Sequence, residues 1–421
     1  MQERPKILFI ANQMPLPPDN GARQRALNIS RLLGRFGEVS FVIVQRRAAE
    51  AAILRLNTQE FEVRMALLAA RETLGRFSSI QRRILRELDP NCFATDDYAI
   101  SGADRAKLLE EIQKHDLIWV QDVSTADSCR IGRWPHSVLD TVDVLSNWYR
   151  SVARKEDDPL RRLLDYRLSW IWKRRERTFT ERFDIVTVCS EEERKLWGGH
   201  PRVRVIPNGF NAQPVRLAPD SGPARIGFIG TFEWPPNRDG VEWFARRAWP
   251  LIGRELPGLQ LRVVGRNTND AGKLGPNIAG LGWLEDPGEE IATWSAMIVP
   301  IRFGAGTRVK MAEGFARKCP IVATSVGAFG FGVRDGEEFL LADNARDFAS
   351  ACVRLVSNPG LGKALAARAH QRFLREWTWE SLEGSVRGVV GEFLAGDGSL
   401  RHREAACAPV GASRMQPELT D

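Results

Sequence analysis

The feature that most constrains this chain is a strand–loop–helix pattern that opens each of its two halves. The apolar run Lys6-Ile-Leu-Phe-Ile-Ala11 leads into a polar loop at 12–21 and then into a segment with helical periodicity, Ala22 to Leu33. A second run, Arg225-Ile-Gly-Phe-Ile-Gly230, is followed by another loop and by a helical segment from Gly240. Short apolar strands that alternate with helices are typical of parallel sheets covered on both faces. The repetition predicts an α/β protein with two Rossmann-like, doubly wound domains.

Further apolar runs keep the alternation of strands and helices in both halves. They are Val39–Val44, Leu117–Val120, Ile185–Val188, Leu261–Val264, Met297–Ile301 and Ile321–Ala323. The polar, proline-bearing stretch 210–223 separates the halves, so we expect an N-terminal domain at 1–213 and a C-terminal domain at 214–376. We also expect one long basic helical stretch at 151–183, a helix at 377–395 and a disordered tail at 396–421.

Composition and charge narrow the functional classes. The 421 residues are 43% apolar and 27% charged, which is the balance of a folded protein of more than one domain. The net charge of +7 favours anionic partners such as phosphates or a lipid surface, but it is too diffuse to predict nucleic-acid binding. The six cysteines and five histidines are scattered, so we expect no bound metal and a reducing compartment. Because the sequence shows neither a signal-peptide pattern nor 18 successive apolar residues, we expect a cytoplasmic protein.

The most informative stretch is a predicted strand, a Gly-Ala-Gly loop and a helix that we expect to begin near Thr307. Backbone N–H groups at a helix N-terminus attract anions, and Gly306 allows a phosphate to approach them. Arg308 and Lys310 place two cations in the predicted first turn. This is the unfavourable end of the helix dipole for a cation unless an anion is bound there. The pattern therefore indicates a phosphate-binding site.

Two other interpretations of this helix have to be considered. It can be a surface helix whose basic residues contact solvent or Glu313, and the sequence leaves this open. A dinucleotide-binding fingerprint fails, because Gly304 and Gly306 supply only the first two glycines and Val309 stands at the third position. Glu313 itself lies about 7 Å along the axis from Arg308, at ~1.5 Å per residue, where it could bind two ribose hydroxyls.

Motifs along nearly the whole chain support one family resemblance. They are Pro17-Pro-Asp-Asn-Gly21-Ala-Arg-Gln-Arg25, Val205-Ile-Pro-Asn-Gly209, Gly230-Thr-Phe-Glu-Trp-Pro-Pro-Asn237, Val264-Gly265, Gly282-Trp-Leu-Glu-Asp286, Gly306-Thr-Arg-Val-Lys310-Met-Ala-Glu313 and Pro320-Ile-Val-Ala-Thr324. In this order they resemble the retaining glycosyltransferases of family 4, which have the GT-B fold. The resemblance is closest to a subgroup with a Gly-x-Gly-Thr-Arg-x-Lys loop, of the type that makes bacterial polysaccharides. It implies two domains facing a cleft, with the C-terminal helix crossing back onto the N-terminal domain.

The resemblance implies transfer of a sugar from a nucleotide-diphosphate-sugar to an acceptor, with retention of configuration and without a cofactor. Glu313 matches the glutamate that holds the ribose, Leu284 the position whose backbone meets the base, and Gly21 the glycine that approaches the phosphates. The implied donor-binding set is Gly21, Leu284, Gly306, Thr307, Arg308, Lys310 and Glu313. The implied catalytic residues are Arg308, Lys310 and Asp143.

The sequence also departs from the family pattern. Ala305 stands where the first glutamate of the motif is usual, so that contact to the donor sugar is absent. Thr231 and Asn237 replace an arginine and a lysine, and we expect Arg308 and Lys310 to take over the diphosphate. Val142 replaces a histidine, although Asp143 beside it is retained.

The acceptor is expected on the N-terminal domain, and the family suggests a glycan or a lipid-linked molecule at the cytoplasmic face of the membrane. Arg23 and Arg25, in the first turn of the first helix, are the candidate acceptor-binding residues, although solvated arginines are an equally good reading. Asp140 is interpreted as a turn or cap residue. The stretch Trp170–Arg175 combines aromatic and basic side chains, which suits peripheral contact with an anionic membrane. Its alternative is a helix with tryptophans facing the core and cations facing water.

Two rival functions remain open from the sequence. A nucleotide-sugar epimerase of the same fold would convert its donor without an acceptor. A non-catalytic protein that binds nucleotide within a polysaccharide assembly is also conceivable, because the glutamate expected at Ala305 is missing. The joint presence of Arg308, Lys310 and Glu313 argues against the second rival.

Overall fold

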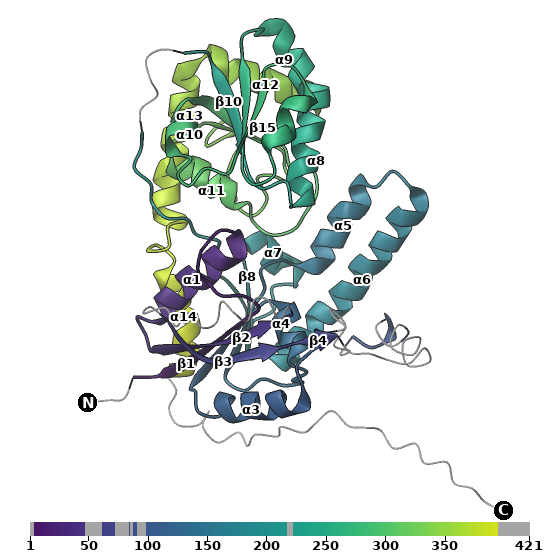
Figure 1. The fold of residues 1–421 in the computed structure, drawn as a ribbon, viewed down its shortest axis with the longest axis vertical. Helices are drawn as coiled ribbons and strands as arrows, with labels where there is room; N and C mark the ends of the chain where they lie inside the picture. Colours follow the sequence, from purple (N-terminus) through teal and green to yellow (C-terminus); the bar gives the residue numbers. More distant parts are fainter. Residues whose placement is uncertain are drawn as a thin grey trace, which may run out of the picture.

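The computed structural model describes residues 4–46, 61–71, 84, 87–90, 98–216 and 222–394, and it shows two α/β domains, one above the other (Figure 1). The tail expected at 396–421 lies outside these residues. In the N-terminal domain, seven parallel strands pair in the order β3-β2-β1-β6-β7-β8-β9. The strands are β1 (Lys6–Ala11), β2 (Glu38–Gln45), β3 (Glu62–Leu68), β6 (Leu117–Gln121), β7 (Ser137–Asp140), β8 (Ile185–Val188) and β9 (Val203–Val205).

Helices cover both faces of this sheet, and an apolar core lies on each face. The helices described are α1 (Gly21–Leu33), α3 (Gly102–Ile112), α4 (Val123–Ser128), α5 (Leu145–Lys155), α6 (Pro159–Arg182) and α7 (Glu191–Leu196). A short antiparallel pair, β4 (Ala70–Arg71) and β5 (Tyr98–Ala99), lies beside them. The single stretch predicted at 151–183 is instead a helical hairpin. The predicted single helix is interrupted because Asp158 caps α6 by accepting from Leu160 N and Arg161 N, and because Pro159 favours a new helix start.

The C-terminal domain contains six parallel strands in the order β12-β11-β10-β13-β14-β15 around one large core. The strands are β10 (Arg225–Ile229), β11 (Gln260–Val264), β12 (Ile278–Gly282), β13 (Trp294–Val299), β14 (Ile321–Ala323) and β15 (Leu340–Leu341). The helices are α8 (Pro235–Trp243), α9 (Trp249–Glu255), α10 (Gly288–Ala292), α11 (Val309–Ala316), α12 (Ala345–Ser357) and α13 (Pro359–Glu376), with a π-helical turn at Phe244–Ala248 and a 3-10 turn at Asn269–Leu274. The helix expected from Gly240 begins at Pro235, because a proline is well suited to the first helical turn.

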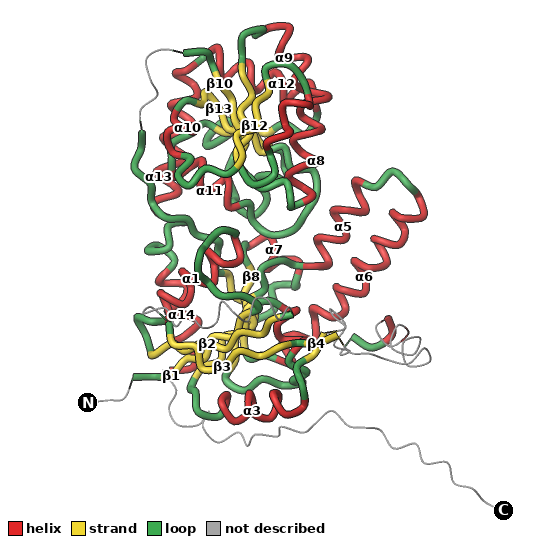
Figure 2. Tube along the Cα trace, viewed as in Figure 1, coloured by secondary structure: helices red, strands yellow, loops and turns green. Residues whose placement is uncertain are grey.

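The chain returns to the N-terminal domain through a short non-helical crossing, residues 377–382, after α13 (Figure 2). Trp377 is buried in the C-terminal core, whereas Trp379 is buried in a core of the N-terminal domain. Between them the backbone pairs with Phe210, whose N–H donates to the Trp377 carbonyl at 2.9 Å. The helix predicted at 377–395 therefore begins only at Glu383. This last helix, α14 (Glu383–Leu394), packs on α1.

The strand orders confirm the prediction of two doubly wound domains. In the N-terminal sheet the chain runs outward from β1 to β3 and then returns to β6 on the other side of β1. In the C-terminal sheet it runs from β10 to β12 and returns to β13 beside β10. Ligands of such sheets bind outside the carboxyl ends of the strands at this reversal of order. The loops that follow β7 and β13 lie against each other, since a Cβ atom at Gly306 would contact Asp143.

Candidate active site between the two domains

The loop that follows β13 forms the centre of the candidate site. At Gly306 the backbone has φ of +73°, and a Cβ atom there would lie 2.2 Å from Asp143 Oδ1. Only glycine meets both requirements, because other residues disfavour this conformation and no side chain fits in the space. The loop 304–308 therefore contacts the N-terminal domain directly through its backbone.

Arg308 was predicted to lie in the first turn of the helix, but it immediately precedes the helix. Helix α11 begins at Val309, and Arg308 occupies the N-cap position with an extended backbone. The residue is 4% exposed, and its guanidinium carbon lies 5.2 Å from the ring centroid of Trp234. Nη1 donates to the Ala305 carbonyl, but among the residues the structure describes Nε and Nη2 have no hydrogen-bond partner. Burial lowers the pKa of Arg308 to about 10, although the Asp143 carboxylate opposes that shift. A buried cation with unused N–H groups is suited to an anionic ligand.

Lys310 lies in the first turn of α11, close to the end of β10. Its Nζ donates to Asn237 Oδ1 at 2.5 Å and lies 4.1 Å from the ring centroid of Phe228. Burial and the neighbouring Arg308 lower the pKa of Lys310 well below its usual value. Gly230, with φ of +151°, allows this approach, since a Cβ there would lie 2.7 Å from Nζ. The two predicted diphosphate cations are thus neighbours at one helix start.

Glu313 lies one turn further along α11. It pairs with Arg317 and not with Arg308 or Lys310, the basic residues considered in the sequence analysis. Its Oε1 accepts from Arg317 Nε at 3.2 Å, and its side chain is 12% exposed. Arg317 also faces Asp286 at 3.6 Å. Burial raises the pKa of Glu313, while Arg317 acts to lower it. The surface-helix alternative, in which the cations pair with Glu313 or with solvent, is not what the structure shows.

Two carboxylates of the N-terminal domain face the cations of the loop. Asp143 follows β7, and burial raises its pKa to about 6 even though Arg308 acts to lower it. Glu193, on α7, is fully buried and accepts from Gly306 N at 3.1 Å. Burial and the charge of Asp143 raise the pKa of Glu193 to about 7. The sequence analysis missed Glu193, although Ser190-Glu-Glu-Glu193 has the Ser-x-x-Glu spacing of a capping box.

Gly21 and Arg23 lie at the start of α1, where the N-terminal domain faces α11. A Cβ on Gly21 would lie 3.6 Å from Val309 Cγ2, which places this helix start beside the start of α11. Arg23 donates to Gln13 Oε1 at 3.1 Å and to Asp19 Oδ1 at 3.0 Å, and its side chain is 22% exposed. Asp19 also pairs with Arg266 of the C-terminal domain at 2.9 Å. Arg23 therefore remains at the domain boundary and partly accessible.

Arg25, expected to bind the acceptor, instead belongs to the N-terminal core. It is 1% exposed, and its Nη2 lies 2.7 Å from Oδ1 of Asp140, which is itself fully buried. Nη1 donates to the Pro207 carbonyl at 3.2 Å and to Asn208 Oδ1 at 3.0 Å. The reading of Asp140 as a turn or cap residue is wrong for the same reason, because its carboxylate balances this buried cation. Neither residue is available to a substrate.

The remaining donor candidates lie on different parts of the C-terminal domain. Thr307 is buried, and its Oγ1 accepts from Asn208 Nδ2 at 2.9 Å, so it is a contact between the domains. Leu284 follows β12 and packs, half-buried, against the C-terminal core. Gly282 just before it has φ of +68°. Helix α5 of the N-terminal domain also reaches the loop, where Trp148 lies 6.2 Å from Phe303 between ring centroids.

The stretch Trp170–Arg175 divides between the two interpretations considered for it. Trp172 is buried beneath Arg175, with 5.2 Å between the guanidinium and the ring, so this half faces the core. Trp170 is 58% exposed, and Arg174 lies 4.8 Å from its ring. This half of α6 therefore presents an aromatic and a basic side chain at the surface.

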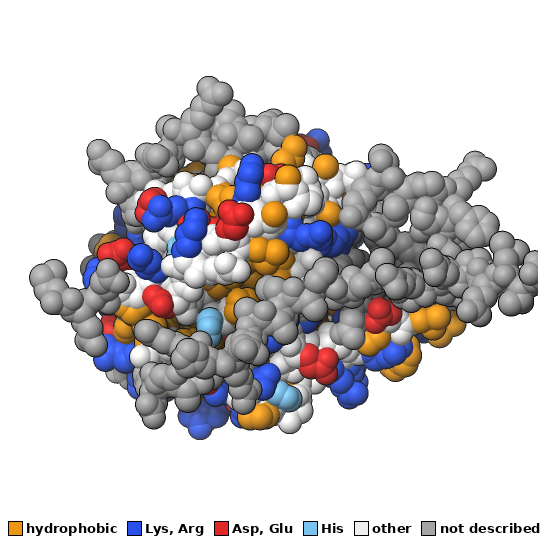
Figure 3. All heavy atoms as spheres, turned by 90° about the horizontal axis from the view of Figure 1, so that it is seen from below, with side chains coloured by type: hydrophobic (Ala, Val, Ile, Leu, Met, Phe, Trp, Pro, Cys, Tyr) orange, Lys and Arg blue, Asp and Glu red, His pale blue; other side chains and the backbone are white. Residues whose placement is uncertain are grey.

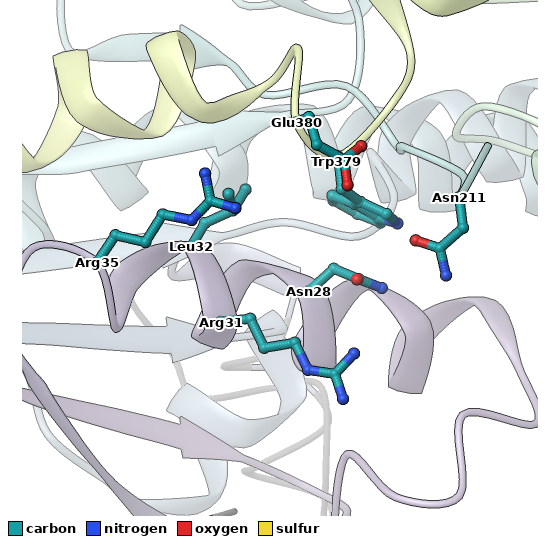
Figure 4. Close-up of a pocket in the computed structure, with 7 residues that line it drawn as sticks. All are labelled: Asn28, Arg31, Leu32, Arg35, Asn211, Trp379 and Glu380. Carbon is teal, nitrogen blue, oxygen red and sulfur yellow. The ribbon is translucent and has the colours of Figure 1, made fainter.

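An open pocket lies away from this loop, between α1 and the crossing that precedes α14 (Figure 4). Its lining residues are Asn28, Arg31, Leu32, Arg35, Asn211, Trp379 and Glu380. None of them belongs to the predicted donor set. Within the described ranges, no three His, Cys, Asp or Glu side chains form a group that could hold a metal ion. Over the same residues, the structure has no helix with the length and apolar character needed to cross a membrane.

Comparison with known proteins shows similarity over part of the chain. Residues 223–358 match the family described as Glycosyl transferases group 1. The phosphatidyl-myo-inositol mannosyltransferase of Mycobacterium leprae is 30% identical over 208 residues, covering 46% of this chain and 54% of that protein. The chain therefore spans about half of that relative's length. Residues 223–358, which make up most of the C-terminal domain, are therefore similar to the proteins of that family.

Solved structures share the fold over nearly the whole chain. The sucrose-phosphate synthase of Thermosynechococcus elongatus has a TM-score of 0.66 and 16% identity, covering 93% of this chain and all of that one at 100%. The Anabaena protein HepE, in complex with UDP and glucose, has a TM-score of 0.61 and 14% identity, with coverage of 92% and 100%. The two α/β domains thus have the GT-B arrangement.

Proposed function

We propose that the protein is a retaining glycosyltransferase that transfers a sugar, of the hexose class, from a nucleotide-diphosphate-sugar to an acceptor. The observation that carries this proposal is that Nε and Nη2 of Arg308, beside Lys310 at the start of α11, have no hydrogen-bond partner among the described residues. Helix N-termini favour phosphate, and a bound diphosphate would satisfy donors that are otherwise buried without a partner. The family match of this same segment supports the assignment.

In the proposed complex, Arg308, Lys310, Gly306 and Thr307 surround the diphosphate, with Gly21 approaching from the other domain. Glu313 takes the ribose hydroxyls, and the backbone at Leu284 meets the base. The UDP bound to HepE makes a uridine nucleotide the first donor to test.

The chemical step requires stabilisation of the charge that develops on the leaving diphosphate. Preorganised cations in a site that excludes water supply this most effectively, and Arg308 and Lys310 have that position. We assign retention to attack from the same face as the leaving group, with a donor phosphate oxygen accepting the proton of the acceptor hydroxyl. Asp143, which lies against Gly306, is assigned to orient the reacting groups.

The proposal is tested by screening UDP-, GDP- and ADP-sugars for thermal stabilisation of the protein in the presence of EDTA. A ligand that binds only the folded state increases the free energy of unfolding, by about 2.7 kcal/mol at a concentration of 100 times its Kd. It therefore raises the melting temperature. We expect at least one donor to stabilise the protein in EDTA, because two cations already stand at the phosphate site. Transfer to an added acceptor, with no conversion of the donor alone, distinguishes the transferase from an epimerase. If no donor binds, the proposed function fails.

We further propose that the acceptor is a glycan or a lipid-linked molecule and that the protein contacts an anionic membrane peripherally at the cytoplasmic face. Support comes from the outer half of α6, part of the hairpin that projects from the body (Figure 1), where Leu160, Leu163 and Trp170 are 66%, 65% and 58% exposed. The adjacent Arg161 and Arg162 are exposed as well. By contrast, the face of the N-terminal domain that points away from the C-terminal domain carries both acidic and basic side chains (Figure 3). Exposed apolar and basic side chains on one helix suit a headgroup interface.

Membrane contact predicts that Arg161→Ser with Arg162→Ser weakens sedimentation with anionic vesicles. Each arginine near anionic lipid contributes about 1 kcal/mol, so the pair should change partitioning about 30-fold at low salt. The effect should shrink at high salt, where the charges are screened. The matched control is Arg246→Ser with Arg247→Ser, two exposed arginines of the C-terminal domain. Equal partitioning of all proteins with anionic and neutral vesicles would contradict membrane contact but not sugar transfer.

A further inference from the structure

Three hydrogen bonds attach the loop 304–308 to the N-terminal domain. Gly304 N donates to Ser151 Oγ at 2.8 Å, and Asn208 Nδ2 donates to Thr307 Oγ1 at 2.9 Å. Between these two, Gly306 N donates to the carboxylate of Glu193 at 3.1 Å. Of the three N-terminal partners, Glu193 alone carries a charge. The loop that presents Arg308 is therefore positioned partly by the other domain.

Both oxygens of Glu193 are used as acceptors. Oε2 accepts from Cys189 N at 2.9 Å within its own domain, and Oε1 accepts from Gly306 N across the domain boundary. The first turn of α7 fixes the side chain, because Glu193 N donates to Ser190 Oγ at 3.1 Å. These two N–H donors face different oxygens of the side chain, and an amide would turn its NH₂ group, which cannot accept, toward one of them. The arrangement specifically requires a carboxylate.

Burial of the Glu193 carboxylate is also unfavourable in free energy unless its hydrogen bonds and ion pairs compensate for the loss of hydration. Glu193 is fully buried, and the charged or titratable groups around it are Asp143, Arg308, Arg25 and Cys189. Asp143 repels its charge, whereas Arg308 and Arg25 attract it. A buried carboxylate that joins two domains, beside the loop of a candidate active site, is better explained by alignment of the site than by stability alone.

We propose that Glu193 is a positioning residue that holds the loop 304–308, and with it Arg308, against the N-terminal domain. The inference rests on the proposed function in so far as the aligned loop is the donor site. Glu193 does not touch the donor; it acts through the Gly306 amide.

The test compares Glu193→Gln with Glu191→Gln, a matched change at an exposed glutamate of the same helix. In Glu193→Gln we expect kcat to fall about tenfold or more, since a hydrogen bond to a charged group is lost. The Kd for UDP should stay within about threefold, because the proposed UDP site lies on the C-terminal domain. The melting temperature should fall only modestly, because the amide oxygen can still accept from Cys189 N within the same domain. Small-angle scattering should show a larger radius of gyration for Glu193→Gln than for the wild type. Glu191→Gln should match the wild type in every measurement.

A second variant, Ser151→Ala, removes a neighbouring attachment of the loop without altering a buried charge. It should show the same changes in kcat and radius of gyration, but smaller ones. Wild-type kcat and an unchanged radius of gyration in Glu193→Gln would overturn the inference. A parallel loss of melting temperature, UDP affinity and activity, with no effect of Ser151→Ala, would show a merely structural role and overturn it too. If the wild type transfers no sugar, the proposed function fails, while the scattering comparison still decides whether Glu193 holds the domains together.

Discussion

Arg308→Ala is expected to lower the turnover of sugar transfer by about 100-fold or more. Loss of one preorganised donor to a developing negative charge typically reduces kcat by about 10²–10³. Within the part of the chain that the structure describes, Nε and Nη2 of Arg308 have no protein partner, and the burial of Arg308 keeps water from replacing them. Turnover should fall more than substrate affinity, because the interaction strengthens as the leaving group gains charge. The measurement is kcat and KM with the donor that the thermal screen identifies.

Two further variants make the result specific. Arg308→Lys keeps a positive charge but loses the planar fork of N–H donors, so it should restore activity only in part. Lys273→Ala removes a cation of the same domain whose side chain is 78% exposed, and it should leave transfer unchanged. Transfer by Arg308→Ala at the wild-type rate would show that the donor site lies elsewhere.

Arg25→Met should cause the largest loss of stability among single changes near the site. Removing one partner of a buried ion pair commonly costs about 3–5 kcal/mol, because the other charge remains buried without compensation. Here Asp140 would be left in the core, although Thr187 Oγ1 still donates to it at 2.6 Å. The free energy of unfolding from urea titration is the quantity to compare. An effect on transfer is expected only through the lost stability.

Arg23→Met is the matched control, since Arg23 lies two residues earlier on the same helix and its pair with Asp19 is partly accessible, with side chains 22% and 15% exposed. Because water reaches this pair, it should contribute only about 0–1 kcal/mol. If Arg25→Met and Arg23→Met had the same free energy of unfolding, the buried pair with Asp140 would not stabilise the fold as expected. Equal stability together with a selective loss of acceptor binding would restore the original expectation for Arg25.

The fold could be predicted because its signals are local. Apolar runs such as 6–11 and 225–230 are strands buried on both faces, and each is followed by a loop and a helix with its own start signals. The ends of the helices were harder to predict from the sequence. Trp377 and Trp379 have similar side chains, yet they are buried in different domains, so the apolar pattern alone could not show that the helix starts later, at Glu383.

The candidate site was predictable where glycines and cations follow a strand within one segment, as at Gly306, Arg308 and Lys310. It was not predictable where partners come from distant parts of the chain. Arg25 and Asp140 are 115 residues apart, and nothing local distinguishes the buried Arg25 from the partly exposed Arg23. Glu193 reaches Gly306 across 113 residues, and its local sequence indicates only a helix cap.

The central claim is that the start of α11 binds the diphosphate of a nucleotide-sugar. A crystal structure of the wild-type protein with UDP tests it most directly. The account predicts diphosphate oxygens within hydrogen-bond distance of Arg308 and Lys310, with the ribose hydroxyls on Glu313. Binding of UDP at any other place, such as the pocket beside Trp379, with Arg308 still unpartnered, would contradict it.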